Sequence, residues 1–173
     1  MRSGARVLST GVVAGVVTVA VVAGVLLRAP HGVPPEEARA TNSRPAGPAA
    51  LRVLAAWDRR RADAWAAGAP VRLARLYAAG SQTGRRDVRA LARWHRRGLR
   101  VVGLHQQVAA AQVLAHRPGR VVLRVTDRTL GGVAVGGPHR VGLPQSLWRT
   151  HRVVLSRSRG TWRVVEARAQ PAR

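Results

Sequence analysis

Apolar residues divide the chain into an uncharged N-terminal segment and a longer part with two kinds of periodicity. No charged residue occurs between Val7 and Leu27, where Val, Gly and Ala fill most positions. A helix rises about 1.5 Å per residue, so this stretch would span roughly 30 Å, the thickness of a bilayer's hydrocarbon core. We therefore expect residues 7–27 to form a transmembrane helix after a short tail, residues 1–6.

A cleaved signal peptide is the alternative for this segment. Its apolar core usually runs only about 7–15 residues and is closely followed by a small-x-small cleavage site. Ala38-Arg39-Ala40 fits such a site but lies well beyond Leu27, so an uncleaved signal anchor is favoured. Arg2 and Arg6 immediately precede the apolar run, although basic residues nearly balance on its two sides. The expected topology leaves residues 1–6 in the cytosol and places the C-terminal part outside.

Residues 28–49 contain five prolines and little apolar content, which predicts an extended linker. Helical spacings of three and four follow it and predict three helices, over residues 51–67, from Pro70 to before Gly80, and over 87–97. The apolar edges of these helices comprise Leu54, Trp57, Arg61 and Trp65, then Leu73, Leu76 and Tyr77, then Val88, Leu91, Ala92 and His95. Gly80 to Gly84 is expected to be a loop.

After residue 98, apolar and polar residues alternate in place of the helical spacing. This alternation predicts one long strand over 99–115, a second over 120–129 with Val121, Leu123 and Val125 on one face, and a closing hairpin. The hairpin joins residues 148–157 to 161–168 across Ser158-Arg159-Gly160. Gly131 to Gly137 is expected to be a flexible hairpin tip or a lid. Three helices before antiparallel strands predict an α+β domain over residues 50–168, with 169–173 as a C-terminal tail.

Charge narrows the classes of partner. Thirty basic residues, all of them arginine, face seven acidic ones and give a net charge of +23. The absence of Lys, Ile and Phe is typical of a GC-rich bacterial coding sequence, but the surplus itself favours contact with lipid headgroups, anionic wall polymers or nucleic acid. A merely solvated basic surface is an equal alternative. The absence of cysteine excludes disulfides, thiolate metal sites and a lipid-carrying cysteine.

The third predicted helix carries the densest basic group. Its candidate polyanion contacts are Arg85, Arg86, Arg89, Arg93, Arg96 and Arg97. Nucleic-acid binding would favour aromatic residues interleaved for base stacking, whereas the five Trp mostly follow core periodicity. We therefore expect non-specific electrostatic contact with an anionic lipid or wall polymer, and no specific nucleic acid.

The order of elements resembles the nuclear transport factor two-like superfamily, which includes SnoaL-like and ketosteroid-isomerase-like proteins. The residues that carry the resemblance are Trp57 and Trp65, Leu76-Tyr77-Ala78 before a Gly-Ser loop, the helix between Gly84 and Gly98, and Gly160-Thr161-Trp162-Arg163-Val164. The resemblance covers residues 50–168. It implies a curved antiparallel sheet wrapped around three helices as a cone, which in some members holds a small apolar ligand. Several exported bacterial members stand behind a single membrane helix, including Mce-associated proteins and subunits of secretion or conjugation machinery.

Enzymatic members place an Asp or a His–Asp pair, often with Tyr, inside the cone. The candidate pocket residues here are Trp57, Asp58, Tyr77, His105, Asp127 and His151. Each has a structural alternative: a surface or helix-pairing carboxylate for Asp58, a hydroxyl bonded to the backbone for Tyr77, and an arginine partner for Asp127. His105 and His151 could meet across the sheet.

Motifs for other chemistry are missing from the sequence. Gly131 to Gly137 lacks the Lys-Ser/Thr ending of a phosphate loop, and neither Ser81 nor Ser146 lies in a nucleophile elbow. No two His share metal-ligand spacing with a carboxylate, so we expect neither a metal nor a cofactor.

These patterns together predict a single-pass, membrane-anchored, exported and non-catalytic interaction domain of the bacterial cell envelope, with other envelope proteins as partners. A small-molecule-binding or isomerase/cyclase-type domain is the first alternative. A cytosolic-facing basic domain that binds nucleic acid is the second, and it requires the inverted topology.

Overall fold

A computed structural model describes residues 44–170. The predicted N-terminal tail, the predicted transmembrane helix and most of the predicted linker lie outside the described residues. Within residues 44–170, no helix is both long enough and apolar enough to cross a membrane.

Three helices precede most of the sheet, as the sequence predicts: α1 Pro48–Ala66, α2 Pro70–Ala74 and α3 Gln82–Arg96. Proline occupies the first turn of α1 and of α2, where its missing N–H leaves no hydrogen bond unmade. Helix α3 begins five residues before the predicted start at Asp87, so the loop predicted over 80–84 is confined to residues 80 and 81. The reason is a cap: the Ser81 hydroxyl accepts a hydrogen bond from the Gly84 N–H at 3.0 Å.

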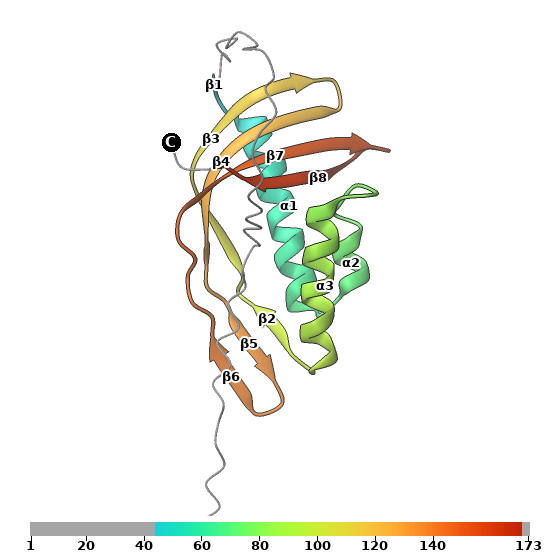
Figure 1. Ribbon diagram of the computed structural model, residues 1–173, viewed down its shortest axis with the longest axis vertical. Helices are drawn as coiled ribbons and strands as arrows, with labels where there is room; N and C mark the ends of the chain where they lie inside the picture. Colours follow the sequence, from blue (N-terminus) through green and yellow to red (C-terminus); the bar gives the residue numbers. More distant parts are fainter. Residues whose placement is uncertain (1–43, 171–173) are drawn as a thin grey trace, which may run out of the picture. The chain divides into compact units, whose positions relative to one another are not determined.

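A five-stranded antiparallel sheet provides the main layer against the helices (Figure 1). Its order is β1-β3-β4-β7-β8. The strands are β1 Arg44–Pro45, β3 His105–Arg117, β4 Arg120–Leu130, β7 Arg149–Ser158 and β8 Thr161–Ala169. The alternation predicted for β4 is confirmed, because Val121, Leu123 and Val125 are buried in the core. The terminal hairpin is also confirmed: Arg159 and Gly160 both have positive φ, as a type I′ turn requires.

A smaller sheet of order β2-β5-β6 lies beyond the end of the first. Its strands are β2 Arg100–Val102, β5 Val133–Gly136 and β6 His139–Gly142. The long strand predicted over 99–115 is therefore two strands in different sheets, divided at Gly103, where φ is +69°. The hairpin tip or lid predicted over 131–137 is mostly strand β5, and only Gly137 lies in the turn to β6. Gly136 allows that strand to approach the backbone, because an added Cβ would lie 2.5 Å from the Gly98 carbonyl oxygen.

The core lies between the helices and the inner face of the five-stranded sheet. Four leucines with no solvent exposure mark its centre: Leu73, Leu91, Leu123 and Leu155. Val101 and Ala134 extend the same apolar cluster to the small sheet. The α+β class is confirmed, although the strands form two antiparallel sheets instead of one.

Candidate functional site

The helices are joined by a charged pair that the sequence does not reveal. Asp87 of α3 receives two hydrogen bonds from the Arg61 guanidinium of α1, Nε to Oδ2 and Nη2 to Oδ1, each at 2.8 Å. The Tyr77 hydroxyl donates to Asp87 Oδ2 at 2.7 Å, and Trp65 Nε1 donates to Oδ1 at 3.3 Å. The two charged side chains are only 12% and 11% exposed. We call Arg61, Trp65, Tyr77 and Asp87 the helix network.

The protonation state of the helix network follows from its contacts. Burial alone would raise the pKa of Asp87, but the Arg61 charge and the donated hydrogen bonds hold the pKa of that carboxyl below its usual range. Burial and the Asp87 charge raise the pKa of Tyr77. Asp87 therefore remains a carboxylate and Tyr77 a neutral donor near neutral pH. The network joins α1, α3 and the segment that follows α2 to one another.

Two predicted pocket residues belong to this packing. The Tyr77 hydroxyl reaches a side chain, so the expected backbone partner is wrong. Trp57 donates from Nε1 to the Leu76 carbonyl oxygen at 3.0 Å, and its ring meets Tyr77 edge-on with centroids 5.6 Å apart. The two aromatic side chains are brought together by the end of α2.

The other four candidates form a second polar group between α1 and the sheet, and Arg61 of the helix network acts electrostatically on its Asp58. His151 Nε2 lies 3.4 Å from Asp127 Oδ1, so Asp127 faces a histidine, while Arg149 is directly opposite it in the sheet. Burial raises the pKa of Asp58, against the lowering effects of Arg61, a Gln106 backbone hydrogen bond and His105. The Asp127 charge adds to the rise. Asp58 is half-buried, which distinguishes it from a fully exposed surface carboxylate.

The histidines of this polar group occupy different strands. His105 belongs to β3 and His151 to β7, and both strands pair with β4, which carries Asp127. Asp127 thus stands on the strand between them. In the described part of the chain, no group of three His, Cys, Asp or Glu side chains has a geometry that could hold a metal ion.

Two open grooves occur on the surface of residues 44–170, and neither includes this polar group. One, of about 400 Å³, lies between α1 and the tip of the β7–β8 hairpin, over Trp57 and Trp162. The other, of about 350 Å³, lies between the end of α2 and the first half of α3. Arg85 and Arg89 border this second groove.

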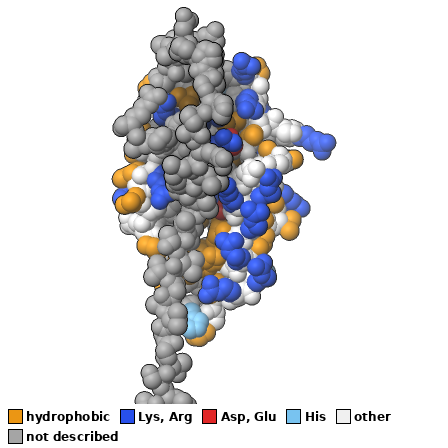
Figure 2. Space-filling model, viewed as in Figure 1, with side chains coloured by type: hydrophobic (Ala, Val, Ile, Leu, Met, Phe, Trp, Pro, Cys, Tyr) orange, Lys and Arg blue, Asp and Glu red, His pale blue; other side chains and the backbone are white. Residues whose placement is uncertain are grey.

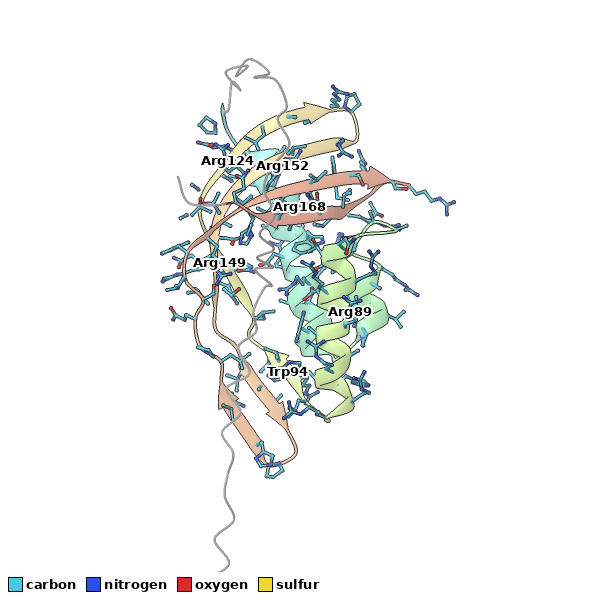
Figure 3. All side chains as sticks on the ribbon, in the orientation of Figure 1. Arg89, Trp94, Arg124, Arg149, Arg152 and Arg168 are labelled. Atoms are coloured by element: carbon cyan, nitrogen blue, oxygen red, sulfur yellow. The ribbon has the colours of Figure 1, made fainter. Side chains whose placement is uncertain are left out.

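Helix α3 carries an exposed row of arginines. Arg85, Arg89, Arg93 and Arg96 follow spacings of four, four and three, which places them on one face of a helix. We call these four residues the α3 stripe. They are exposed, as are the adjoining Arg86 and Arg97, whereas Leu91 and Trp94 of the same helix are buried. Figure 2 shows arginine side chains gathered over the helices, and Figure 3 places Arg89 and Trp94 on α3.

Sequence reasoning grouped Arg61 with the apolar residues of its helix but did not identify its partner. The available signal was position: Arg61 lies four residues from Trp57 and four from Trp65, on the face that must be buried. An arginine there requires a carboxylate, and the chain has only seven acidic residues. Nothing in the sequence singles out Asp87 from the others.

No protein-family model matches the chain, and no curated protein is similar to it in sequence. Among solved structures, the intermembrane-space region of the chloroplast protein ARC6 superimposes with a TM-score of 0.54 at 13% identity, over 75% of this chain and 99% of that one. An uncharacterised protein with a cystatin-like fold from Caulobacter vibrioides reaches 0.43 at 14% identity, over 71% and 89%. The second value is too low to support an argument. The first establishes a likeness of fold alone.

Proposed function

We propose that the chain is an exported, membrane-anchored and non-catalytic interaction domain of the cell envelope, and that the α3 stripe binds its anionic partner. The observation that carries the proposal is the uncompensated charge of this helix. Asp87 is the only acidic residue in α3, and it is buried against Arg61. The outward face of the helix is therefore cationic along its length.

The position of the arginines argues against a purely structural role. Cations near a helix C-terminus are stabilised by the macrodipole, which would account for Arg93 and Arg96. Arg85 and Arg86 lie near the N-terminus, where a positive charge is unfavourable. Arg85 partly offsets this by donating to the Gly80 carbonyl oxygen at 2.8 Å. Positive charges at a position that the helix dipole disfavours are expected if these arginines bind a ligand.

Retention on an immobilised anionic polymer tests the proposal. The full chain is held in neutral detergent, and the salt concentration that elutes it is measured. Changing Arg85, Arg89, Arg93 and Arg96 to Gln should lower that concentration strongly, because counterion release scales with the number of contacts. The control variant changes four exposed arginines outside α3, namely Arg52, Arg59, Arg117 and Arg140, to Gln. Equal effects of the two sets would show that bulk charge, and not the α3 stripe, governs binding.

The anchor and the family resemblance complete the proposal. An uncharged apolar stretch of bilayer length supports membrane insertion, and the likeness of fold is compatible with a nuclear transport factor two-like domain similar to Mce-associated envelope proteins. Extraction of membranes with alkaline carbonate should leave the full chain in the pellet. Release into the supernatant would contradict an integral anchor.

The raised pKa of Asp58 favours one second candidate, an isomerase- or cyclase-type domain. Asp58, Asp127 and His151 would then act near a carbonyl compound, with a carboxylate of raised pKa as the proton acceptor. Such an activity predicts exchange of α-protons of a β,γ-unsaturated ketone in D2O, lost in Asp58→Asn and in His151→Ala. No exchange above that of buffer would remove this candidate.

A further inference from the structure

Three arginines stand side by side across the five-stranded sheet. Arg124 of β4 is directly opposite Arg152 of β7, and Arg152 is directly opposite Arg168 of β8. We call these residues the arginine ladder. Directly opposite residues of antiparallel strands have Cβ atoms about 4.5–5.5 Å apart, and like charges in such positions destabilise a sheet. Figure 3 shows the three residues following one another across the strands.

The arginine ladder faces away from the helices. Side chains alternate between the two faces of a strand, and Leu123 and Val125, on either side of Arg124, are buried in the core. Arg152 precedes the core residue Val153 in the same way. The arginine ladder is therefore on the opposite face of the sheet from α3, and its charge is separate from that of the α3 stripe.

Among the described residues, the outer two arginines have partners and the central one has none. Arg124 donates from Nε to Gln170 Oε1 at 3.2 Å and from Nη1 to Gln112 Oε1 at 3.4 Å. Arg168 pairs with Glu166. Arg152 is half-buried, and within residues 44–170 its guanidinium has neither a hydrogen-bond acceptor nor an ion-pair partner. Glu166 balances the charge of Arg168, whereas the charge of Arg124 is uncompensated, and a partly desolvated cation beside such a like charge is costly unless an anion joins it.

We propose that the arginine ladder binds a soluble ligand with several adjacent phosphate groups, and that Arg152 provides the central contact. A guanidinium offers parallel N–H donors that match two oxygens of one phosphate. Strands lie about 4.8 Å apart, so the three arginines cover roughly 10 Å. A single phosphate can join two of them, whereas an oligophosphate can reach all three. The neutral amides of Gln112 and Gln170 hold Arg124 in place without cancelling its charge.

Titration calorimetry of the full chain in neutral detergent, with inorganic tripolyphosphate and with orthophosphate, tests this proposal. Tripolyphosphate should bind more tightly than orthophosphate and should raise the melting temperature. Arg152→Gln should weaken tripolyphosphate binding roughly tenfold or more, because a charge-assisted pair is lost. Arg152→Lys should give an intermediate affinity, since it keeps the charge but loses the planar fork. The ligand-free Arg152→Gln chain should melt no lower than the wild type, because a like-charge contact is removed.

Two controls separate the arginine ladder from bulk charge and from the proposed function. Arg140→Gln removes an exposed arginine from β6, and the four-residue variant of the α3 stripe removes charge from the helix side. Both variants should retain tripolyphosphate binding, whether or not the α3 stripe binds the anionic partner of the proposed function. Equal weakening by Arg140→Gln and Arg152→Gln, or the absence of tripolyphosphate binding, would overturn the proposal. Arg152-dependent binding to phosphatidylglycerol vesicles without binding of tripolyphosphate would overturn it in favour of a lipid headgroup.

Discussion

Replacing Asp87 with Asn should strongly lower the free energy of unfolding, because the helix network depends on this carboxylate. The side chain accepts four hydrogen bonds, and two of them come from Arg61. Asn presents one acceptor oxygen, and its NH2 group would face donors. Arg61 cannot lose its proton, so its charge would stay buried without a counter-ion. Removing one partner of a buried ion pair costs about 3–5 kcal/mol, a large share of the roughly 5–15 kcal/mol that stabilises an ordinary domain.

Urea unfolding of the full chain in neutral detergent, followed by tryptophan fluorescence, measures this cost. The double variant Arg61→Met/Asp87→Leu serves as the matched comparison, because it removes both charges and fills the same space. It should be more stable than Asp87→Asn alone, even though Tyr77 and Trp65 lose their acceptor. If Asp87→Asn costs less than about 1 kcal/mol, or if the double variant is the less stable of the two, the helix network does not hold the helices as described.

The same substitution should alter acid sensitivity. The pKa of Asp87 is lowered in the folded chain, so its contribution to stability is present above the unfolded value of about 3.9 and is lost as the pH falls through the lowered folded value. The wild type should therefore lose stability in acid more steeply than Asp87→Asn. If the stability of the wild type and of Asp87→Asn falls equally with decreasing pH, the charge state assigned to Asp87 is contradicted.

Three further substitutions test other parts of the fold by thermal or urea unfolding. Asp58→Asn should raise the melting temperature at neutral pH, because the raised pKa of Asp58 shows that its charged form is unfavourable in the folded chain. The gain should vanish below pH of about 4, where the wild-type carboxyl is protonated in the folded and in the unfolded state. A gain independent of pH would refute this. Gly84→Ala should cost about 1–3 kcal/mol, since its Cβ would lie 2.5 Å from Tyr77 Cγ, and an unchanged midpoint would show that the ring can move. Ser81→Ala should cost about 0.5–2 kcal/mol through loss of the α3 cap; no change would mean that the hydroxyl contributes nothing.

The sequence predicted best those elements whose pattern is enforced by one buried face. Strand β4 alternates because its inner residues enter the core, and the β7–β8 hairpin carries Gly160 at a turn position with positive φ, although Arg159 beside it is not a usual residue for a type I′ turn. Strand β5 was missed because its Gly, Val and Ala residues have little polar contrast. The single strand predicted over 99–115 included Gly103, which separates strands of two sheets.

The candidate sites depend on contacts between residues far apart in the chain. Arg61 and Asp87 are 26 positions apart, and no local pattern pairs one arginine with one of several carboxylates. The arginine ladder depends on the register of three strands, which periodicity alone does not fix. By contrast, the four arginines of the α3 stripe were all among the polyanion contacts predicted from the sequence, although the predicted helix began two residues after Arg85.

Access of protease to the C-terminus in intact cells tests the central claim, that the cationic domain works outside the cytoplasm. The full chain would carry an epitope after its last residue, and cells would be treated with a protease that does not cross membranes. The account predicts loss of the epitope while a cytosolic marker protein remains intact. An epitope that survives until the membrane is permeabilised would place the arginine-rich domain in the cytoplasm, where nucleic acid becomes the favoured partner.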